Sequence, residues 1–238
     1  MAKDSGKPSI SNVFETSLFM GTPEINWDSV TAGHPLRQYK KNQIIFRQET
    51  PCEFVYIVKR GRVRLEICGA NGNTRNLFVA EAGTIIGEQP SIDNRFYLFN
   101  ATASSDCLLY VIPVQDFQNA LEADHKLAMA MLQIMSKKMR LMSMLIKQLS
   151  FNDSYYRVAY ALVNVAQQYS ALTPEGWYKL NIKFTHQEMA DLTGLSRVSV
   201  SNIMLEMTAD GFIEKDTDGY LIVKRLDRLG QLLTESGQ

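Results

Sequence analysis

The chain has 238 residues, of which 45% are hydrophobic and 21% charged, and its 25 basic side chains balance its 25 acidic ones. This composition is typical of a globular protein with one or two domains, and it argues against a protein that coats DNA through net positive charge. Apolar runs fall short of the ~18 residues of a membrane span, and a signal peptide is not recognised, so we expect a cytoplasmic protein without membrane contact.

The first half of the chain predicts antiparallel strands. Residues 1–24 form an N-terminal segment. Residues 54–58, 63–67 and 77–80 alternate or cluster apolar side chains with period two, and short strands at this regular spacing indicate a roll, barrel or sandwich over residues 25–124. Turns are expected at residues 60–61, 69–73 and 81–83.

Helical periodicity begins near residue 113. Residues 113–122 predict a short helix and residues 125–150 a long one, whose apolar side chains recur at alternating spacings of three and four. This is the seam of a coiled-coil partner, although a helix that packs on its own barrel remains an alternative. Two features favour a homodimer through residues 125–151. The other faces look polar (Lys137, Lys138, Arg140, Lys147), and a second, narrower apolar edge (Leu141, Leu145) can serve the barrel. The seam consists of Leu132, Met135, Met139, Met142, Ile146 and Leu149.

The last domain, residues 152–238, contains two short helices separated by a turn at Thr193 and Gly194. The second begins near Ser196, with polar side chains on one face and Val200, Ile203 and Met204 on the other. Two such helices form a helix-turn-helix, although the pattern alone also fits an ordinary helical hairpin. Segments 211–213 and 219–223 predict a β-hairpin beside them, the wing of a winged helix.

This order of elements, together with motifs at 55–61, 83–88, 185–190 and 194–201, resembles the family of the cyclic AMP receptor protein and the fumarate–nitrate regulator (Crp/Fnr) over residues 25–225. The resemblance implies an α+β fold: an antiparallel β-roll like that of cyclic-nucleotide-binding domains, a long central dimerisation helix and a C-terminal winged helix-turn-helix. It also implies a transcription regulator in which a small effector in the roll repositions the DNA-binding domains and RNA polymerase is recruited.

The effector site departs from the cyclic-nucleotide pattern. Gly87 and Glu88 are present, but Phe99 stands where the family's phosphate-binding Arg is expected, and Arg95 would need the loop to realign. A buried phosphate without a cation is costly. We therefore expect a small organic or aromatic effector, as in the halorespiration regulators, and keep cyclic nucleotide as an alternative. The candidate effector residues are Phe78, Gly87, Glu88, Arg95, Tyr97, Phe99, Met139, Met142 and Ser143.

The sequence gives less support to a redox sensor, a metal site or an enzyme. Cys52, Cys68 and Cys107 are widely spaced, so they predict neither a disulfide framework nor a zinc or iron–sulfur site, and a thiol switch remains an alternative. His34, His125 and His186 are too scattered for a cupin-like metal enzyme. We expect no cofactor, no metal and no enzyme. A ligand-binding module that does not contact DNA would leave the C-terminal domain unexplained.

Three positions of the second helix correspond to those that read bases in the family. Arg197 suits guanine, Asn202 suits adenine, and Val198 can contact only a thymine methyl. We therefore expect a palindromic A·T-rich operator in double-stranded DNA. The predicted DNA-binding residues are Thr185, His186, Gln187, Ser196, Arg197, Val198, Ser199, Ser201 and Asn202.

Overall fold

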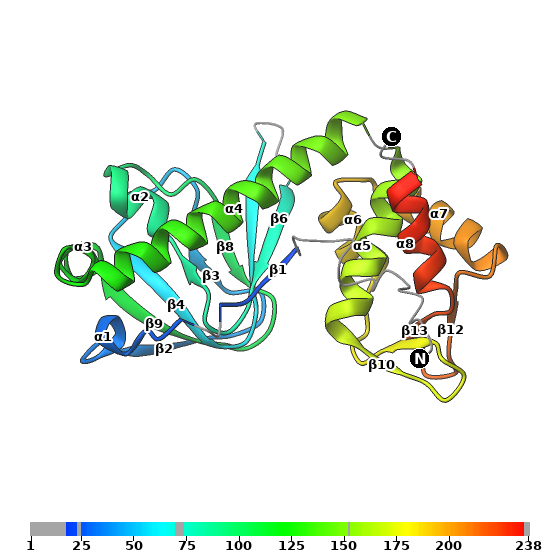
Figure 1. The fold of residues 1–238 in the computed structure, drawn as a ribbon, viewed down its shortest axis with the longest axis horizontal. Coiled ribbons are helices and arrows are strands. Elements are labelled where there is room, and N and C mark those ends of the chain that lie inside the picture. The colour runs from blue at the N-terminus through cyan, green and yellow to red at the C-terminus, as the bar shows by residue number, and fades with distance from the viewer. Residues whose placement is uncertain (1–17, 23–24, 70–73, 152, 236–238) are drawn as a thin grey trace, which may run out of the picture. The chain divides into compact units, whose positions relative to one another are not determined.

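The computed structural model describes residues 18–22, 25–69, 74–151 and 153–235. The chain divides into two compact units within its longest helix, one from Leu18 to Met142 and the other from Ser143 onward (Figure 1). Among the described helices, none combines the length and hydropathy that a membrane span requires. Most of the N-terminal segment and all but the first residue of the turn expected at 69–73 lie outside the described residues.

The first unit is the expected roll, built from a five-stranded and a four-stranded sheet. The strand order is β1-β6-β5-β8-β3 in one sheet and β2-β9-β4-β7 in the other. Neighbouring strands are antiparallel except β1, which pairs in parallel with β6. The strands are β1 (Phe19–Met20), β2 (Leu36–Tyr39), β3 (Ile44–Phe46), β4 (Phe54–Arg60), β5 (Val63–Cys68), β6 (Thr74–Ala80), β7 (Ile85–Ile86), β8 (Asn100–Ala103) and β9 (Cys107–Pro113).

The strands predicted at 54–58, 63–67 and 77–80 are confirmed as β4, β5 and β6. In β5, Val63 and Leu65 are buried while Arg64 and Glu66 are half-buried, as alternation across a pleated sheet requires, but Ile67 at the end of the expected apolar row is exposed. Strand β1 was not predicted, because two residues carry no periodicity. The N-terminal segment therefore adds an edge strand to the roll.

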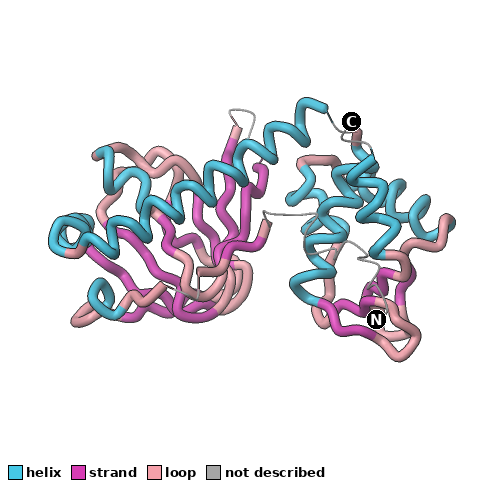
Figure 2. The backbone as a smooth tube through the Cα atoms, in the orientation of Figure 1, coloured by secondary structure: helices cyan, strands magenta, loops and turns pink. Residues whose placement is uncertain are grey.

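Helices cover one end of the roll: α1 (Asp28–Thr31), α2 (Glu88–Asp93), α3 (Val114–Ala123) and the first turns of α4 (His125–Phe151). Figure 2 shows α4 passing diagonally across the strands of the roll. The side chains of Leu127, Met131 and Ile134 on α4 join a core with Val55 and Ile57 of β4. The helices expected at 113–122 and 125–150 are thus confirmed.

The second unit combines helices α5 (Ser154–Tyr169), α6 (His186–Thr193), α7 (Arg197–Ala209) and α8 (Leu226–Glu235) with a four-stranded sheet. Asp153 caps α5 by accepting from the backbone N–H of Tyr156, and α5 supplies a continuous buried core from Val158 to Ala166. The sheet order is β10-β11-β13-β12, from β10 (Ser170–Leu172), β11 (Tyr178–Leu180), β12 (Ile213–Lys215) and β13 (Leu221–Val223). Strands β12 and β13 confirm the predicted wing hairpin.

Candidate functional site

Helix α6 begins and ends where its sequence dictates. Thr185 accepts from the backbone N–H of Glu188, and the Glu188 carboxylate accepts from the backbone N–H of Thr185 at 2.8 Å, a capping box that satisfies two otherwise unpaired donors. Gly194 then takes a left-handed conformation (φ 66°), which ends α6 without steric cost and turns the chain toward α7.

Helix α7 is capped by Ser196, whose hydroxyl accepts from the backbone N–H of Ser199. Its inner face packs Val200, Ile203, Met204 and Met207 into the core of the unit. Arg197, Val198 and Asn202 are exposed on the opposite face, and Val198 keeps 70% of its surface accessible. The helix therefore presents to solvent the three side chains that the sequence predicts to read bases.

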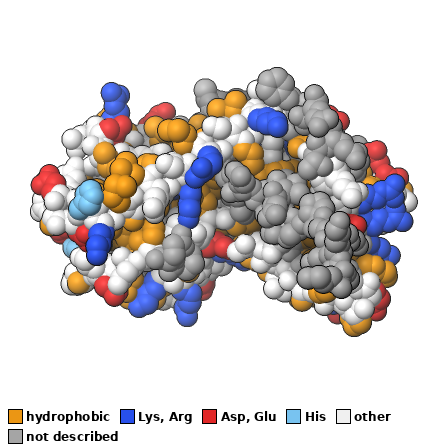
Figure 3. Space-filling model, in the orientation of Figure 1, with side chains coloured by type: hydrophobic (Ala, Val, Ile, Leu, Met, Phe, Trp, Pro, Cys, Tyr) orange, Lys and Arg blue, Asp and Glu red, His pale blue; other side chains and the backbone are white. Residues whose placement is uncertain are grey.

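An open hollow of about 630 Å³ lies between the start of α6, the start of α7 and the wing. Three cationic side chains line it, namely Lys183, Arg197 and Lys215. Figure 3 shows Lys and Arg side chains gathered at the right-hand edge of the view. Lys183 and Lys215 were not among the predicted DNA-binding residues. In the sequence Lys215 is close to Asp216 and Asp218, so this part of the wing carries more negative than positive charge. In the structure the Asp216 carboxylate pairs with Lys179 (2.6 Å) and not with Lys215. The other lining residues are Phe184, Thr185, His186, Gln187 and Gly219.

His186 connects the two helices. Its Nδ1 lies 2.8 Å from the hydroxyl of Ser201 in α7. Partial burial, followed by the nearby positive charges of Lys215 and Arg197, lowers the pKa of His186 below its ordinary value. The same positive charges favour an anion in the hollow, such as a DNA phosphate.

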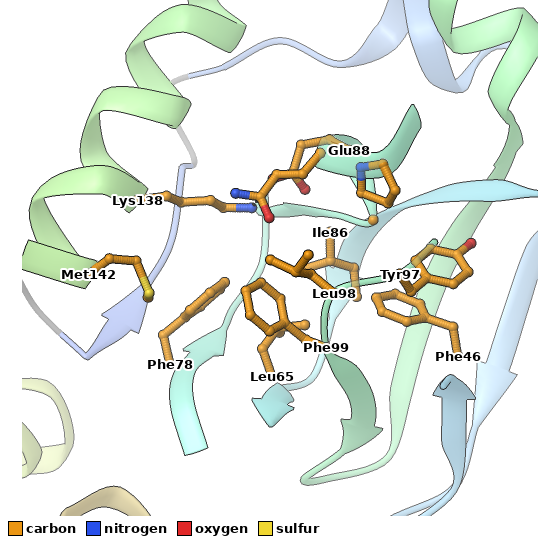
Figure 4. Close-up of a pocket in the computed structure, with 13 residues that line it drawn as sticks. Phe46, Leu65, Phe78, Ile86, Glu88, Tyr97, Leu98, Phe99, Lys138 and Met142 are labelled. Atoms are coloured by element: carbon orange, nitrogen blue, oxygen red, sulfur yellow. Dashed lines mark hydrogen bonds and ion pairs between the residues drawn. The ribbon is translucent and has the colours of Figure 1, made fainter. Parts of the chain in front are cut away.

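A second candidate site is a small, partly open cavity in the roll, at the contact of α2 and β7 with α4 (Figure 4). Its volume of about 30 Å³ is that of roughly one water molecule. The predicted residues Phe78, Gly87, Glu88, Tyr97, Phe99 and Met142 line it, joined by Phe46, Leu65, Ile86, Gln89, Pro90, Leu98 and Lys138. Apart from Glu88, Gln89, Lys138 and the Tyr97 hydroxyl, the lining side chains are apolar.

Three predicted effector residues are not brought to this cavity. The Arg95 side chain is 80% exposed, with its Nε 4.0 Å from the Asp93 carboxylate. Met139 is 70% exposed on α4, and Ser143 is also exposed. Arg95 therefore supplies no cation to the cavity.

The burial of Lys138 contradicts the expectation from the sequence. This residue was expected on a polar outer face of α4, but it is buried, and its Nζ donates to Glu88 Oε1 at 2.6 Å and to the carbonyl of Ile85 at 3.0 Å. A buried Lys needs such partners because desolvation of a lone charge is costly. The signal was present in the sequence, because Lys138 continues the Leu141 and Leu145 edge by one helical turn.

A ring stack and a hydrogen bond of Tyr97 fix one wall of the cavity. Tyr97 stacks on Phe46 with ring centroids 4.0 Å apart, and its hydroxyl donates to the carbonyl of Phe54. Burial raises the pKa of Tyr97 well above its ordinary range. Gly87 adopts φ 80°, and a Cβ there would lie 3.1 Å from the Tyr97 ring, so glycine is needed both for the turn and for the close approach.

The cysteines are unlike redox or metal sites. Burial raises the pKa of Cys52 and of Cys107, which lowers the fraction of reactive thiolate. Over the described ranges, groups of three or more His, Cys, Asp or Glu side chains that could hold a metal are not found.

Comparison with known proteins agrees with this geometry. Residues 36–124 match the cyclic nucleotide-binding domain family, and residues 156–232 match the Crp-like helix-turn-helix domain family. The chain is 26% identical to the cyclic AMP receptor protein of Thermus thermophilus, over 82% of this chain and 87% of the relative. It is 25% identical to the global nitrogen regulator of Synechococcus elongatus, over 71% of this chain and 77% of the relative.

Solved structures show the same architecture. A CRP/FNR-family transcriptional regulator from Thermus thermophilus superposes with a TM-score of 0.70 at 25% identity, covering 84% of this chain and 98% of that one. A CooA mutant from Carboxydothermus hydrogenoformans gives a TM-score of 0.71 at 24% identity, covering 84% of this chain and 88% of that one.

Proposed function

The chain belongs to the Crp/Fnr family of transcription regulators, and from that premise we propose that it is an effector-gated homodimer that binds a palindromic, A·T-rich operator. As a regulator that reads DNA, it acts in the cytoplasm and recruits RNA polymerase once bound. The observation that carries the proposal is the exposed face of α7 beside the cationic hollow.

We assign base recognition to three side chains on that face. Arg197 binds guanine through O6 and N7, Asn202 binds adenine through N6 and N7, and Val198 packs on a thymine methyl. Ser201 is held beside Asn202 by His186. Phosphates are bound by Lys183 and Lys215 and by groups at the two helix starts, where backbone N–H groups point outward. These groups are Thr185, His186, Gln187, Ser196 and Ser199.

We assign dimerisation to the seam of α4. Its residues Leu132, Met139, Ile146 and Leu149 are large apolar side chains that stay exposed in one chain, while Met135 and Met142 are half-buried. A neighbouring stripe of the same helix, which includes Leu141 and Leu145, is buried within the chain. An exposed apolar stripe of this kind marks a protein interface. Two copies related by a two-fold axis then read half-sites about one helical turn apart.

The effector of this proposal is a small organic molecule bound in the roll, in place of cyclic AMP. Two observations support it: the cavity side chains are mainly apolar, and the one Lys at the cavity is already paired with Glu88. The cyclic-nucleotide alternative retains one argument, since Gly87 and Glu88 occupy positions that bind the ribose in nucleotide-binding relatives.

Selection from randomised duplex DNA tests the proposal. Gel shifts should recover a two-fold symmetric A·T-rich sequence, and sedimentation should give a dimer on one such site. The chain with Asn202→Ala serves as a control that should recover a sequence altered at one base pair per half-site. A protein that sediments as one copy and selects no sequence, with or without added small molecules, would overturn the proposal.

A further inference from the structure

The face of α4 that packs inward is a buried stripe with one charge in it. Side chains at alternating spacings of four and three are buried from Leu127 to Gln148, and all are apolar except Lys138 and Gln148. The Lys138 side chain is 6% exposed and its partner Glu88 3%. This charge lies at the wall of the cavity described above (Figure 4).

Two of the three N–H donors of Lys138 are hydrogen-bonded, and its ammonium also lies near an aromatic ring. Of its three donors, one goes to Glu88 and one to the carbonyl of Ile85, while Nζ stands 5.4 Å from the centre of the Phe78 ring. A cation over an aromatic face is a favourable contact. A ligand that enters the cavity must therefore either leave this pair intact or replace one of its members.

A buried ion pair adds little stability compared with an apolar pair of the same size, whereas loss of one partner leaves a costly buried charge. The roll therefore does not need Lys138 and Glu88 for its fold. Any ligand that displaces Glu88 must bring its own negative charge to Lys138.

The rest of the cavity restricts the size and polarity of that ligand. The cavity holds about one water, so a ligand must push side chains outward. Leu98, which is 57% exposed, is the most exposed of the lining residues. In Figure 4 the side chains of Phe78, Leu65 and Phe99 lie below Lys138 and Glu88. Ribose hydroxyls and a purine would meet this apolar surface unpaired, at a cost for each polar group.

We propose that the cavity binds a small organic monoacid whose carboxylate replaces that of Glu88 on Lys138, with its apolar body against Phe78, Phe99 and Met142. This inference rests on the proposed function and names the chemical class of its effector. The exchange keeps one carboxylate on Lys138 throughout. It also breaks the contact between α2, which begins at Glu88, and α4. The residue that follows Lys138 on α4 is the seam residue Met139.

Chemical rescue of the full-length chain tests the exchange. Glu88→Ala removes the carboxylate and opens space beside Lys138, so its Tm in chloride should fall below that of the unsubstituted protein. Propionate or phenylacetate at the same ionic strength should restore the Tm, whereas propionamide, phenylacetamide and cyclic AMP should not. The matched control is Glu122→Ala, which removes an exposed carboxylate of α3 and should respond to none of them.

Two further variants keep the test decisive. Lys138→Met should abolish the Tm increase that phenylacetate gives the unsubstituted protein, and Lys137→Met, on the exposed side of α4, should retain it. If Glu88→Ala does not fold, Glu88→Gln should bind phenylacetate about tenfold more tightly than the unsubstituted protein, because the Glu88 carboxylate no longer competes for Lys138.

The proposal is overturned if the amides act as well as the acids, if cyclic AMP alone restores the Tm, or if no acid shifts the unsubstituted protein. Operator binding, measured in each buffer, separates this failure from that of the proposed function. A protein that selects an operator but ignores acids keeps its function and loses this effector class; one that selects no DNA loses the function itself.

Discussion

The Nδ1 atom of His186 lies 2.8 Å from the Ser201 hydroxyl, which ties the first residue of α6 to the middle of α7. The contact lies where the two helices of the DNA-binding motif must keep a fixed angle. It also holds the Ser201 hydroxyl beside Asn202, one of the proposed base-reading side chains. We therefore expect His186 to position the proposed reading face.

This contact predicts a pH dependence of stability. Burial and the charges of Lys215 and Arg197 lower the pKa of folded His186 below its ordinary 6.5, so the unfolded chain binds the proton more readily. The stabilisation is therefore present above pH ~6.5 and is lost as the pH falls through the lowered pKa. Urea unfolding of this unit, followed by Trp177 fluorescence in a Trp27→Phe background, should show that loss, and His186→Gln should reduce it. A pH profile unchanged by His186→Gln would contradict this assignment.

The salt dependence of DNA affinity should distinguish side chains that contact bases from those that contact phosphates. Arg197→Ala should cost about 1–3 kcal/mol on the selected operator and relax preference at one base pair. Lys183→Ala should weaken all sequences alike and lower the slope of log K against log salt by about 1. Fluorescence anisotropy on matched and mismatched duplexes measures both. Equal loss on every duplex for Arg197→Ala would place that side chain on the backbone.

The seam predicts which substitution separates the two copies. Met139→Lys places a charge where the exposed side chain should be buried in the dimer, and each of two copies loses about 1.5–3 kcal/mol of apolar burial. Sedimentation should shift toward one copy, and operator affinity should fall. Lys137→Glu changes the charge of an exposed neighbour and should leave the dimer intact. A dimer that survives Met139→Lys would move the interface elsewhere.

Sequence periodicity was sufficient to predict the long strands, the long helix α4 and the two helices of the helix-turn-helix, because each carries several repeats of its own pattern. Strand β1 has two residues and pairs with β6 some sixty positions away, so no local signal marks it. Strands β10 and β11 were missed for the same reason, being three residues each around a turn at Gly176. Lys138 was misplaced because its residue type was weighed above its position in the buried stripe.

The location of Arg95 could not be derived in the same way. Its sequence position, seven residues after Glu88, would suit a phosphate-binding Arg only if the loop realigned. However, α2 ends at Asp93, and Asn94 adopts a left-handed conformation (φ 55°) that redirects the chain. The side chain of Arg95 is consequently exposed. Such a change of direction depends on one backbone torsion, which composition and periodicity do not report.

The buried thiol of Cys107 gives a last prediction, which concerns the redox alternative. Its Sγ lies 3.1 Å from the carbonyl oxygens of both Arg62 and Ser105, which can accept its single S–H proton, and burial raises the pKa of Cys107. Its thiolate is therefore scarce at neutral pH, and the same direction holds for Cys52. Iodoacetamide should modify both more slowly in the folded than in the urea-unfolded protein, as mass spectrometry of their peptides would show. Operator binding should be equal in reductant and in mild oxidant, and equal again in Cys52→Ala. A loss of binding on oxidation that Cys52→Ala prevents would restore the thiol switch as a mode of control.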